Sequence, residues 1–194
     1  MKAYILAGGS GSRLSPEKGF LTVGGRTILD RVRSAASPLA SEIVLVGSGE
    51  RLRQEGVRII SEAEPGVRGP LGAVCAALAD AVPDEALILP WDAPFITTPF
   101  LTYLREARGT ADAAVPREGG DIEPLLAVYG PRCLGPAQRA LAAGKRRVIA
   151  FYDELVVRWV GAEELRPFGD WERLLFNVNA PDDLEQARQM AGGA

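Results

Sequence analysis

Apolar segments of the length of buried strands alternate with segments of helical periodicity along most of this chain. The clearest strands are 42–46 and 86–90, and the clearest helices are 27–39 and 69–82. Such alternation predicts a parallel sheet with helices on both of its faces. No repeat, low-complexity tract or long linker interrupts the 194 residues. We therefore expect an α/β fold, a three-layer, doubly wound and mostly parallel sheet, formed as a single domain over residues 1–194.

The remaining expected elements follow the same alternation. Thr27 and Asp30 give the first long helix a start that is similar to a capping box. Further strands are expected at 3–6, 57–60, 111–115, 124–129 and 155–160, and further helices at 99–108, 131–143 and 147–152.

A glycine-rich loop follows the first expected strand. The run from Leu6 to Arg13 reads Leu-Ala-Gly-Gly-Ser-Gly-Ser-Arg, and Lys18 comes five residues later. Small residues let a phosphate approach the backbone N–H groups closely, and Arg13 and Lys18 bring two positive charges to the same loop. A glycine-rich turn without a ligand is the alternative, but it does not explain two cations inside the loop. The sequence thus predicts a loop that binds nucleotide phosphates, in which the amides of Gly8 and Gly9 cradle the phosphate groups.

Two common phosphate loops are excluded by the neighbouring residues. The P-loop needs Ser or Thr after its lysine, and Gly19 stands there. The dinucleotide fingerprint needs Gly or Ala where this chain has Leu14, which is too bulky for close contact between helix and strand. The loop is therefore not typical of a P-loop enzyme or of a nicotinamide or flavin dehydrogenase.

The chain contains no histidine, which excludes catalytic triads, histidine-based acid–base chemistry and most zinc sites. The net charge of −3 argues against nucleic-acid binding. The uncharged runs are shorter than the ~18 residues of a membrane span, and no signal peptide is expected. Cys75 and Cys133 form no metal-type cluster, so a cytoplasmic protein with reduced thiols is expected.

Asp92 follows the apolar strand 86–90 almost directly. Ligands of doubly wound sheets bind at the carboxyl ends of the strands, where a carboxylate can hold Mg²⁺ together with substrate phosphates and water. The alternative is a turn in which Asp92 bonds nearby backbone N–H groups. Together with the N-terminal loop, the sequence favours Asp92 as a magnesium ligand.

These segments resemble the MobA-like nucleotidyltransferases, which attach GMP to molybdenum-bearing molybdopterin. The loop is similar to the family pattern L-A-G-G-x-S-x-R-M-G-x-D-K, with the same spacing from Arg13 to Lys18. The departures are Gly11, Leu14, Ser15 and Glu17. The resemblance implies a Rossmann-like fold of the nucleotide-diphospho-sugar transferase type, and it extends in order over essentially the whole chain.

The resemblance also implies a role for individual residues. Arg13, Lys18 and Asp92 would be catalytic, with Asp92 as the Mg²⁺ ligand. Two positions depart from the family: Gly47 stands where Asn is common, and Trp91 stands where Cys is usual before D-x-P, so that Trp91 either packs against the nucleotide or fills core space. The residues implied to bind the nucleotide are Leu6 and Ala7 through their backbone, Gly8, Gly9, Lys18, Glu62 in place of the usual Asp, Gly69, Pro70, Leu71 and Asp92.

The segment 177–184 is similar to the family pattern N-x-N-T-P-E-D-L. By resemblance, Asn177 and Asn179 face the pterin, although amides that form a turn are an equal alternative. Ala180 replaces the usual Thr cap, and Asp182 and Asp183 favour the positive end of the helix dipole. Arg146 and Arg147 resemble a basic segment that offers cations to the pterin phosphate; a solvated basic turn is the alternative.

The implied reaction is an Mg²⁺-dependent attack of molybdopterin's terminal phosphate on the α-phosphorus of GTP, with release of pyrophosphate. GTP and molybdopterin would be the substrates, with no nucleic-acid or membrane partner, and transient contacts with other cofactor-biosynthesis proteins are compatible with this role. Two alternatives stay open. One is a related nucleotidyltransferase for another nucleotide or acceptor, of the cytidylyltransferase or sugar-1-phosphate type. The other is a non-catalytic nucleotide-binding accessory protein.

Overall fold

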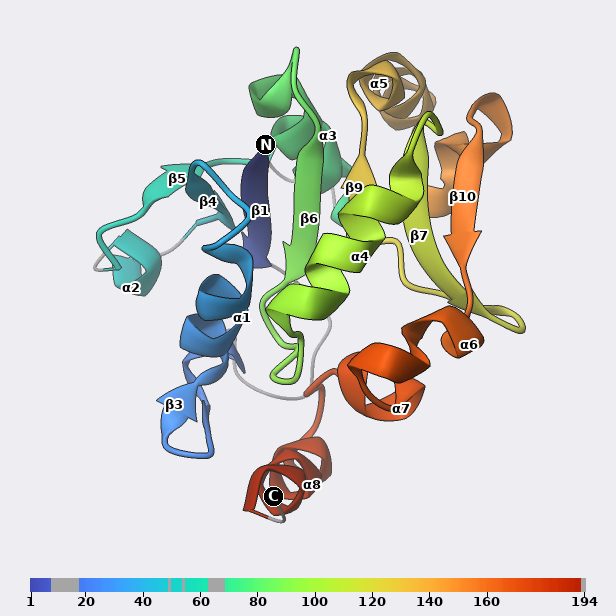
Figure 1. Ribbon diagram of the computed structural model, residues 1–194. Helices are drawn as coiled ribbons and strands as arrows, with labels where there is room; N and C mark the ends of the chain where they lie inside the picture. Colours follow the sequence, from blue (N-terminus) through green and yellow to red (C-terminus); the bar gives the residue numbers. More distant parts are fainter. Residues whose placement is uncertain (8–17, 49, 54, 63–68, 193–194) are drawn as a thin grey trace.

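The protein is described by a computed structural model that covers residues 1–7, 18–48, 50–53, 55–62 and 69–192 (Figure 1). The predicted phosphate loop, with Gly8, Gly9 and Arg13, lies outside these residues. The strands are β1 Lys2–Ala7, β2 Thr22–Val23, β3 Arg26–Thr27, β4 Ile43–Gly47, β5 Arg58–Ile60, β6 Ala86–Pro90, β7 Ala113–Glu118, β8 Asp121–Ile122, β9 Ala127–Tyr129 and β10 Val157–Val160. The α-helices are α1 Ile28–Ala36, α2 Glu50–Arg53, α3 Pro70–Ala81, α4 Thr98–Arg108, α5 Leu134–Ala142, α6 Ala162–Leu165, α7 Trp171–Leu174 and α8 Pro181–Gly192. The 3₁₀-helices are η1 Lys18–Phe20, η2 Pro131–Cys133, η3 Val148–Glu154 and η4 Arg166–Phe168.

The central sheet has the order β10-β7-β9-β6-β1-β4-β5, with β8 paired to β7. Strand β1 pairs in parallel with β4 and β6, β4 with β5, and β7 with β10. Only β9 on this path runs antiparallel, against β6 and β7. The expected mostly parallel sheet is confirmed.

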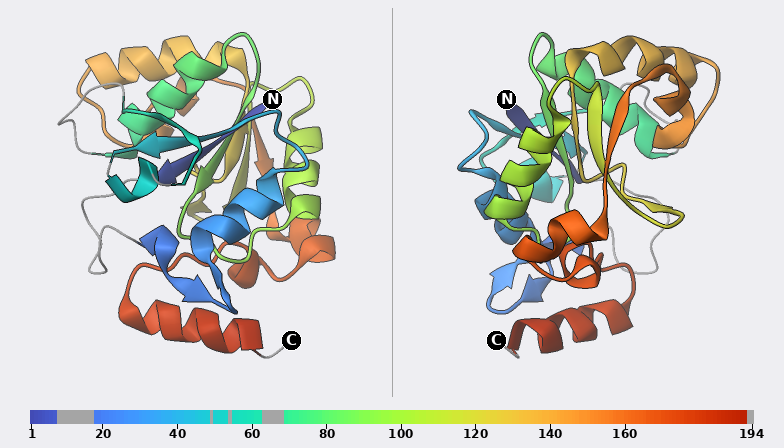
Figure 2. Two further views of the ribbon diagram at one scale, coloured as in Figure 1. Left: turned by 90° about the vertical axis from the view of Figure 1, so that its left-hand side faces the viewer. Right: turned by 45° about the vertical axis from the view of Figure 1, so that its right-hand side comes forward.

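Helices cover both faces of the sheet, as Figure 2 shows. One buried cluster contains residues of α1 and α4, among them Leu29, Val32 and Phe100. The other contains residues of α3 and α5, among them Val74, Leu78 and Leu141. Alternate residues of the central strands supply both clusters, so that Ile5 belongs to the first and Tyr4 to the second. The three-layer arrangement is thus confirmed.

Strand β6 has the predicted bounds, and the Thr27 side chain caps α1 by accepting from the Asp30 N–H at 3.1 Å. Helix α1 ends at Ala36 rather than at the predicted residue 39, because Pro38 has no N–H with which to continue it. The strand predicted at 124–129 begins only at Ala127, after a turn in which Leu126 N–H donates to the Glu123 carbonyl at 3.1 Å.

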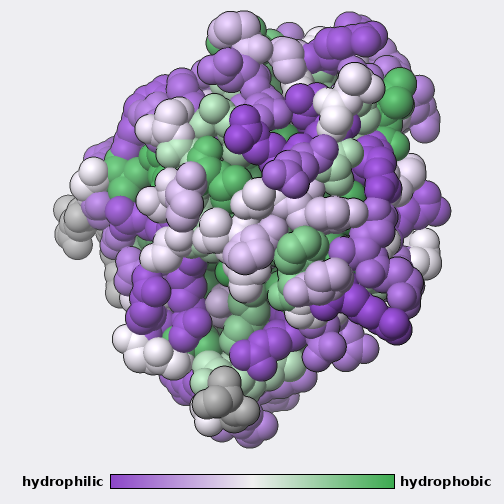
Figure 3. All heavy atoms as spheres, in the orientation of Figure 1, coloured by the Kyte–Doolittle hydropathy of each residue, from purple (hydrophilic) through white to green (hydrophobic). Residues whose placement is uncertain are grey.

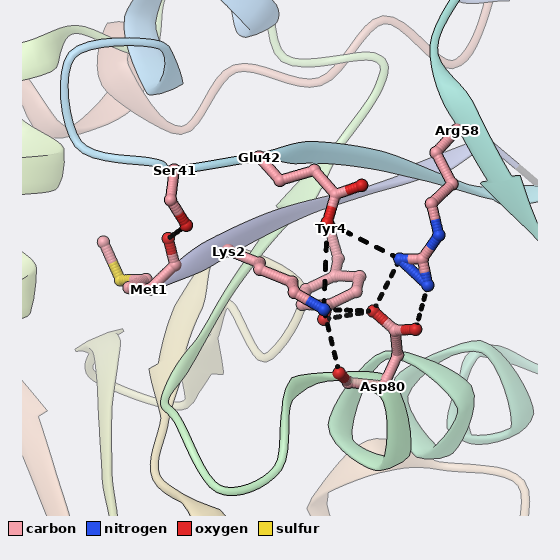
Figure 4. Close-up of polar contacts among 7 residues, drawn as sticks. All are labelled: Met1, Lys2, Tyr4, Ser41, Glu42, Arg58 and Asp80. Atoms are coloured by element: carbon pink, nitrogen blue, oxygen red, sulfur yellow. Dashed lines mark hydrogen bonds and ion pairs between the residues drawn. The ribbon is translucent and has the colours of Figure 1, made fainter.

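A polar network ties β1, β5 and α3 together where the parallel strands begin (Figure 4). Asp80 accepts from Tyr4 Oη at 2.8 Å and from Lys2 Nζ at 3.1 Å, and Arg58 binds both of its carboxylate oxygens. Glu42 lies 3.7 Å from Lys2 Nζ and 3.6 Å from Arg58 Nη1. This network lies at the amino ends of the parallel strands, whereas Asp92 lies at their carboxyl ends.

Hydrophilic residues cover much of the face that Figure 3 shows, with hydrophobic residues in small groups among them. Within the described part of the chain, no helix has the length and apolar character needed to cross a membrane.

Candidate nucleotide-transfer site

The carboxyl ends of the parallel strands meet at the lower edge of the sheet in Figure 1. The register pairs Ala7 with Gly47 and Leu6 with Pro90, so that β1, β4 and β6 end side by side. Asp92 lies two residues beyond β6, and Lys18 begins η1 at the far end of the loop that leaves β1. The fold therefore brings both predicted catalytic residues to one edge.

Lys18 forms the centre of this site. Its side chain is only 8% exposed, and its Nζ lies 3.2 Å from Asp92 Oδ2. The same Nζ donates to Asn179 Oδ1 at 2.6 Å. The resemblance assigned Lys18 and Asp92 to the nucleotide and Asn179 to the pterin, and the structure joins all three through the ammonium group.

The electrostatics of Asp92 reflect two opposing effects. Burial raises the pKa of its carboxyl group, while the charge of Lys18 and the hydrogen bond from it lower the pKa; the net shift is upward. The Asp92 carbonyl accepts from Val178 N–H at 2.9 Å, which attaches the C-terminal segment to the end of β6.

Trp91 fills core space next to Lys18. It is 6% exposed, and its ring meets Phe20 edge-on at a centroid distance of 6.1 Å. A Cβ at Gly19 would stand 2.6 Å from Trp91 Cε3, so this close approach of η1 to the end of β6 requires glycine. Of the two roles considered for Trp91, the structure shows the core role.

Glu123 is a carboxylate of this site that the sequence analysis missed. It lies four residues before β9, whose antiparallel pairing with β6 brings it to the edge where Asp92 stands. Burial, followed by the charges of Asp121 and Asp92, raises the pKa of Glu123 to about 6. No sequence signal indicated this position, because it depends on the antiparallel pairing of β9 with β6, which the alternation of strands and helices does not reveal.

The predicted nucleotide segment at α3 lies against the predicted basic segment. Gly69 has a φ of 124° and precedes Pro70, the first residue of α3. A Cβ at Gly69 would meet Arg146 Cβ and its carbonyl oxygen at 3.0 Å, and Leu71 N–H donates to that carbonyl at 3.3 Å. The side chains of Arg146 and Arg147 are exposed. Residues expected to serve two different substrates are therefore neighbours.

Four further predicted residues lie at the ends of strands or near Asp92. Leu6 and Ala7 are each 5% exposed, which leaves their backbone rather than their side chains for contact with a base. Glu62 is half-buried two residues after β5, and burial raises its pKa. Asn177 Oδ1 is buried and has no hydrogen-bond partner among the described residues. The described part of the chain contains no group of three or more His, Cys, Asp or Glu residues placed to hold a metal ion.

A mostly parallel α/β sheet with a lysine–carboxylate pair at the carboxyl ends of its strands is the arrangement of a ligand-binding α/β enzyme. The chain belongs to the MobA-like NTP transferase family, whose model matches residues 3–156. It is accordingly a nucleotidyltransferase.

Curated relatives are similar over nearly their whole length. A probable molybdenum cofactor guanylyltransferase of Pelotomaculum thermopropionicum is 38% identical over 189 residues, covering 96% of this chain and 91% of that protein. The molybdenum cofactor guanylyltransferase of Syntrophotalea carbinolica is 30% identical over 194 residues, covering 98% and 92%.

Solved structures show the same fold. The molybdopterin-guanine dinucleotide biosynthesis protein A of Archaeoglobus fulgidus superposes with a TM-score of 0.84 at 27% identity, over 100% of both chains. The 2-C-methyl-D-erythritol 4-phosphate cytidylyltransferase of Thermus thermophilus superposes with a TM-score of 0.70 at 19% identity, over 99% of this chain and 100% of that one. The second likeness concerns the fold alone.

Proposed function

We propose that this enzyme transfers GMP from GTP to molybdopterin and releases pyrophosphate. The guanylyltransferases named above support this substrate pair, since they are similar along nearly the whole chain. The observation that carries the proposal is the contact of Lys18 with both Asp92 and Asn179, because it joins the residues assigned to the two substrates at one point. A cytoplasmic location and contacts with other cofactor-biosynthesis proteins stay predictions.

The chain's own residues would act mainly by positioning and by neutralising charge, which provide most of the rate enhancement in phosphate chemistry. Lys18 and Arg13 would stabilise the negative charge that develops on the departing pyrophosphate. The amides of Gly8 and Gly9 would cradle the phosphates. Glu62, the backbone of Leu6 and Ala7, and the segment 69–71 would hold the nucleoside.

We assign Mg²⁺ to Asp92. The donors fit this ion, because the carboxylate of Asp92 and the neighbouring carboxylate of Glu123 are hard oxygen ligands whose mutual repulsion a cation relieves. When bound there, Mg²⁺ would neutralise phosphate charge in the transferring nucleotide. Lys18 would then turn from Asp92 to the phosphates.

The pterin would lie on the C-terminal side of Lys18. Asn179 is exposed and reaches Lys18, and Asn177 has a buried amide oxygen without a described partner. Arg146 and Arg147 are exposed beside Gly69, at a position that suits a phosphate group.

Thermal stabilisation by nucleotides tests the binding half of this proposal. A ligand that binds only the folded state raises the melting temperature according to ln(1 + [L]/Kd). With Mg²⁺ present, we expect GTP to raise it more than CTP, ATP or UTP, and Asp92→Asn to abolish most of the difference. Asp84→Asn, an exposed aspartate beyond α3, is the matched control. A selective shift with CTP would favour a cytidylyltransferase, and no shift with any nucleotide would contradict the proposal.

A further inference from the structure

The start of α8 is held by the Asp183 carboxylate. Asp183 Oδ2 accepts from the backbone N–H groups of Asn179 and Ala180, both at 2.8 Å. In a capping box, a side chain at the third helical position binds the N-cap backbone while the N-cap side chain binds back. Ala180 has no side-chain oxygen for the second half, so the geometry of this turn depends on Asp183.

Asn179 depends on that turn for its orientation. Its side chain is exposed, so core packing does not fix it, yet its amide oxygen accepts from Lys18 Nζ at 2.6 Å. The backbone is anchored on both sides of it, at Val178 by the Asp92 carbonyl and at Asn179 and Ala180 by Asp183. The direction of the Asn179 side chain is therefore set by these backbone contacts.

Helix α8 also holds the other end of the segment that contains Lys18. Arg188 Nε donates to the carbonyl of Thr22, the first residue of β2, at 3.3 Å. Figure 2 shows α8 lying along the hairpin of β2 and β3. Residues 18–22 are thus held at both ends by the C-terminal segment, at Lys18 by Asn179, which lies just before α8, and at Thr22 by Arg188 of α8.

We infer that Asp183 is a positioning residue, which acts through Asn179 to hold the Lys18 ammonium group in place. The consequence for catalysis rests on the proposed function. If Asp92 turns toward a divalent cation, Lys18 loses one of the two acceptors that it has among the described residues, and Asn179 is the one of these two that remains. The C-terminal helix then determines where the ammonium group meets the phosphates.

The chain has only three lysines, Lys2, Lys18 and Lys145, so NMR of protein labelled with ¹⁵Nζ-lysine gives a direct test that needs no activity. Lys18→Arg identifies the Lys18 ammonium signal. We expect Asp183→Ala to shift or broaden that signal as Asn179→Ala does, while the Lys2 and Lys145 signals stay in place. Asp182→Ala is the matched control, because it removes the same charge from the same helical turn; it should leave the Lys18 signal unchanged.

Kinetics then test the consequence for transfer. Asp183→Ala and Asn179→Ala should each lower kcat by roughly tenfold, as loss of a residue that orients a catalytic group does. The double variant should be no slower than Asn179→Ala, because both changes remove one contact. Asp183→Asn, whose amide oxygen still accepts, should restore most of the rate, and Asp182→Ala should stay within about twofold.

A lower melting temperature in Asp183→Ala with an unchanged Lys18 signal would overturn the inference and leave Asp183 as a helix cap alone. Effects of Asp183→Ala and Asn179→Ala that multiply in the double variant would overturn it as well. If the Lys18 signal moves as expected but the wild-type protein transfers no GMP, the proposed function fails and the positioning role stands.

Discussion

Gly47 shows at the scale of one residue why this chain departs from the family pattern. It ends β4 with a φ of 156°, paired in register with Ala7 of β1. A Cβ at this position would stand 2.6 Å from the carbonyl oxygen of Ala7. An asparagine at this point, which the family pattern has, would therefore require a shift of β4 relative to β1.

Gly47→Asn should accordingly destabilise the protein. We expect the free energy of unfolding to fall by about 1–3 kcal/mol, the cost of a side chain held in a disfavoured backbone conformation. Gly120→Ala is the control, since a Cβ there meets open space, and it should change stability by less than about 0.5 kcal/mol. Urea denaturation checks both variants, and an unchanged transition in Gly47→Asn would show that β4 adapts freely.

The sequence was sufficient to predict that Lys18 and Asp92 lie close together, because each follows a strand of a parallel sheet at its carboxyl end. It was not sufficient for Glu123, whose place depends on the antiparallel strand β9. Nor did it indicate that Asn179 contacts Lys18, since that contact depends on how α8 returns to the sheet edge. The roles of Gly8, Gly9 and Arg13 stay predictions, because these residues lie outside the described part of the chain.

At the scale of elements, the Asp80 network joins three of them at the edge opposite the site. Partial burial alone would raise the pKa of Asp80, but hydrogen bonds from Tyr4 and Lys2 and the charge of Arg58 outweigh it. The pKa of Asp80 therefore lies below its ordinary value. Ionised Asp80 thus stabilises the folded state.

Asp80→Asn tests this linkage through its dependence on pH. A lowered folded pKa contributes stability that is present above the unfolded pKa, ~3.9, and is lost as the pH falls through the folded pKa. The variant should be less stable than the wild type by about 1–2 kcal/mol at pH 7, from weaker hydrogen bonds at a charged group. The difference should narrow below about pH 4. Equilibrium denaturation across pH measures it, with Asp84→Asn as the control; a difference independent of pH would contradict the account.

Elements with strong local signals were predictable, and elements set by tertiary contacts were not. Strand β6 is apolar throughout and appears with its predicted bounds. The hairpin of β2 and β3 and the short helices α6 and α7 were not predicted. Each of these consists of two to four residues, too few for a periodic pattern. Helix α6 also has a contact far away in the sequence, because Tyr103 Oη of α4 donates to Glu164 at 2.8 Å.

At the scale of the whole molecule, the fold gathers distant parts of the chain at one edge. Lys18 and Asn179 are 161 positions apart in the sequence and are in direct contact. The two hydrophobic clusters on either side of the sheet hold β1, β4 and β6 in register. The C-terminal segment adds contacts to this end of the sheet through Asn179 at Lys18, Val178 at Asp92 and Arg188 at Thr22.

The most direct test of the central claim is transfer of label from α-³²P-GTP to molybdopterin in the presence of Mg²⁺, with pyrophosphate measured in the same samples. The account predicts one labelled molybdopterin dinucleotide for each pyrophosphate released. It also predicts a rate that Lys18→Ala lowers about 10²–10³-fold, as expected for loss of a group that stabilises transition-state charge. Transfer from CTP in preference to GTP, or tight binding of GTP with no transfer at saturating molybdopterin, would contradict it.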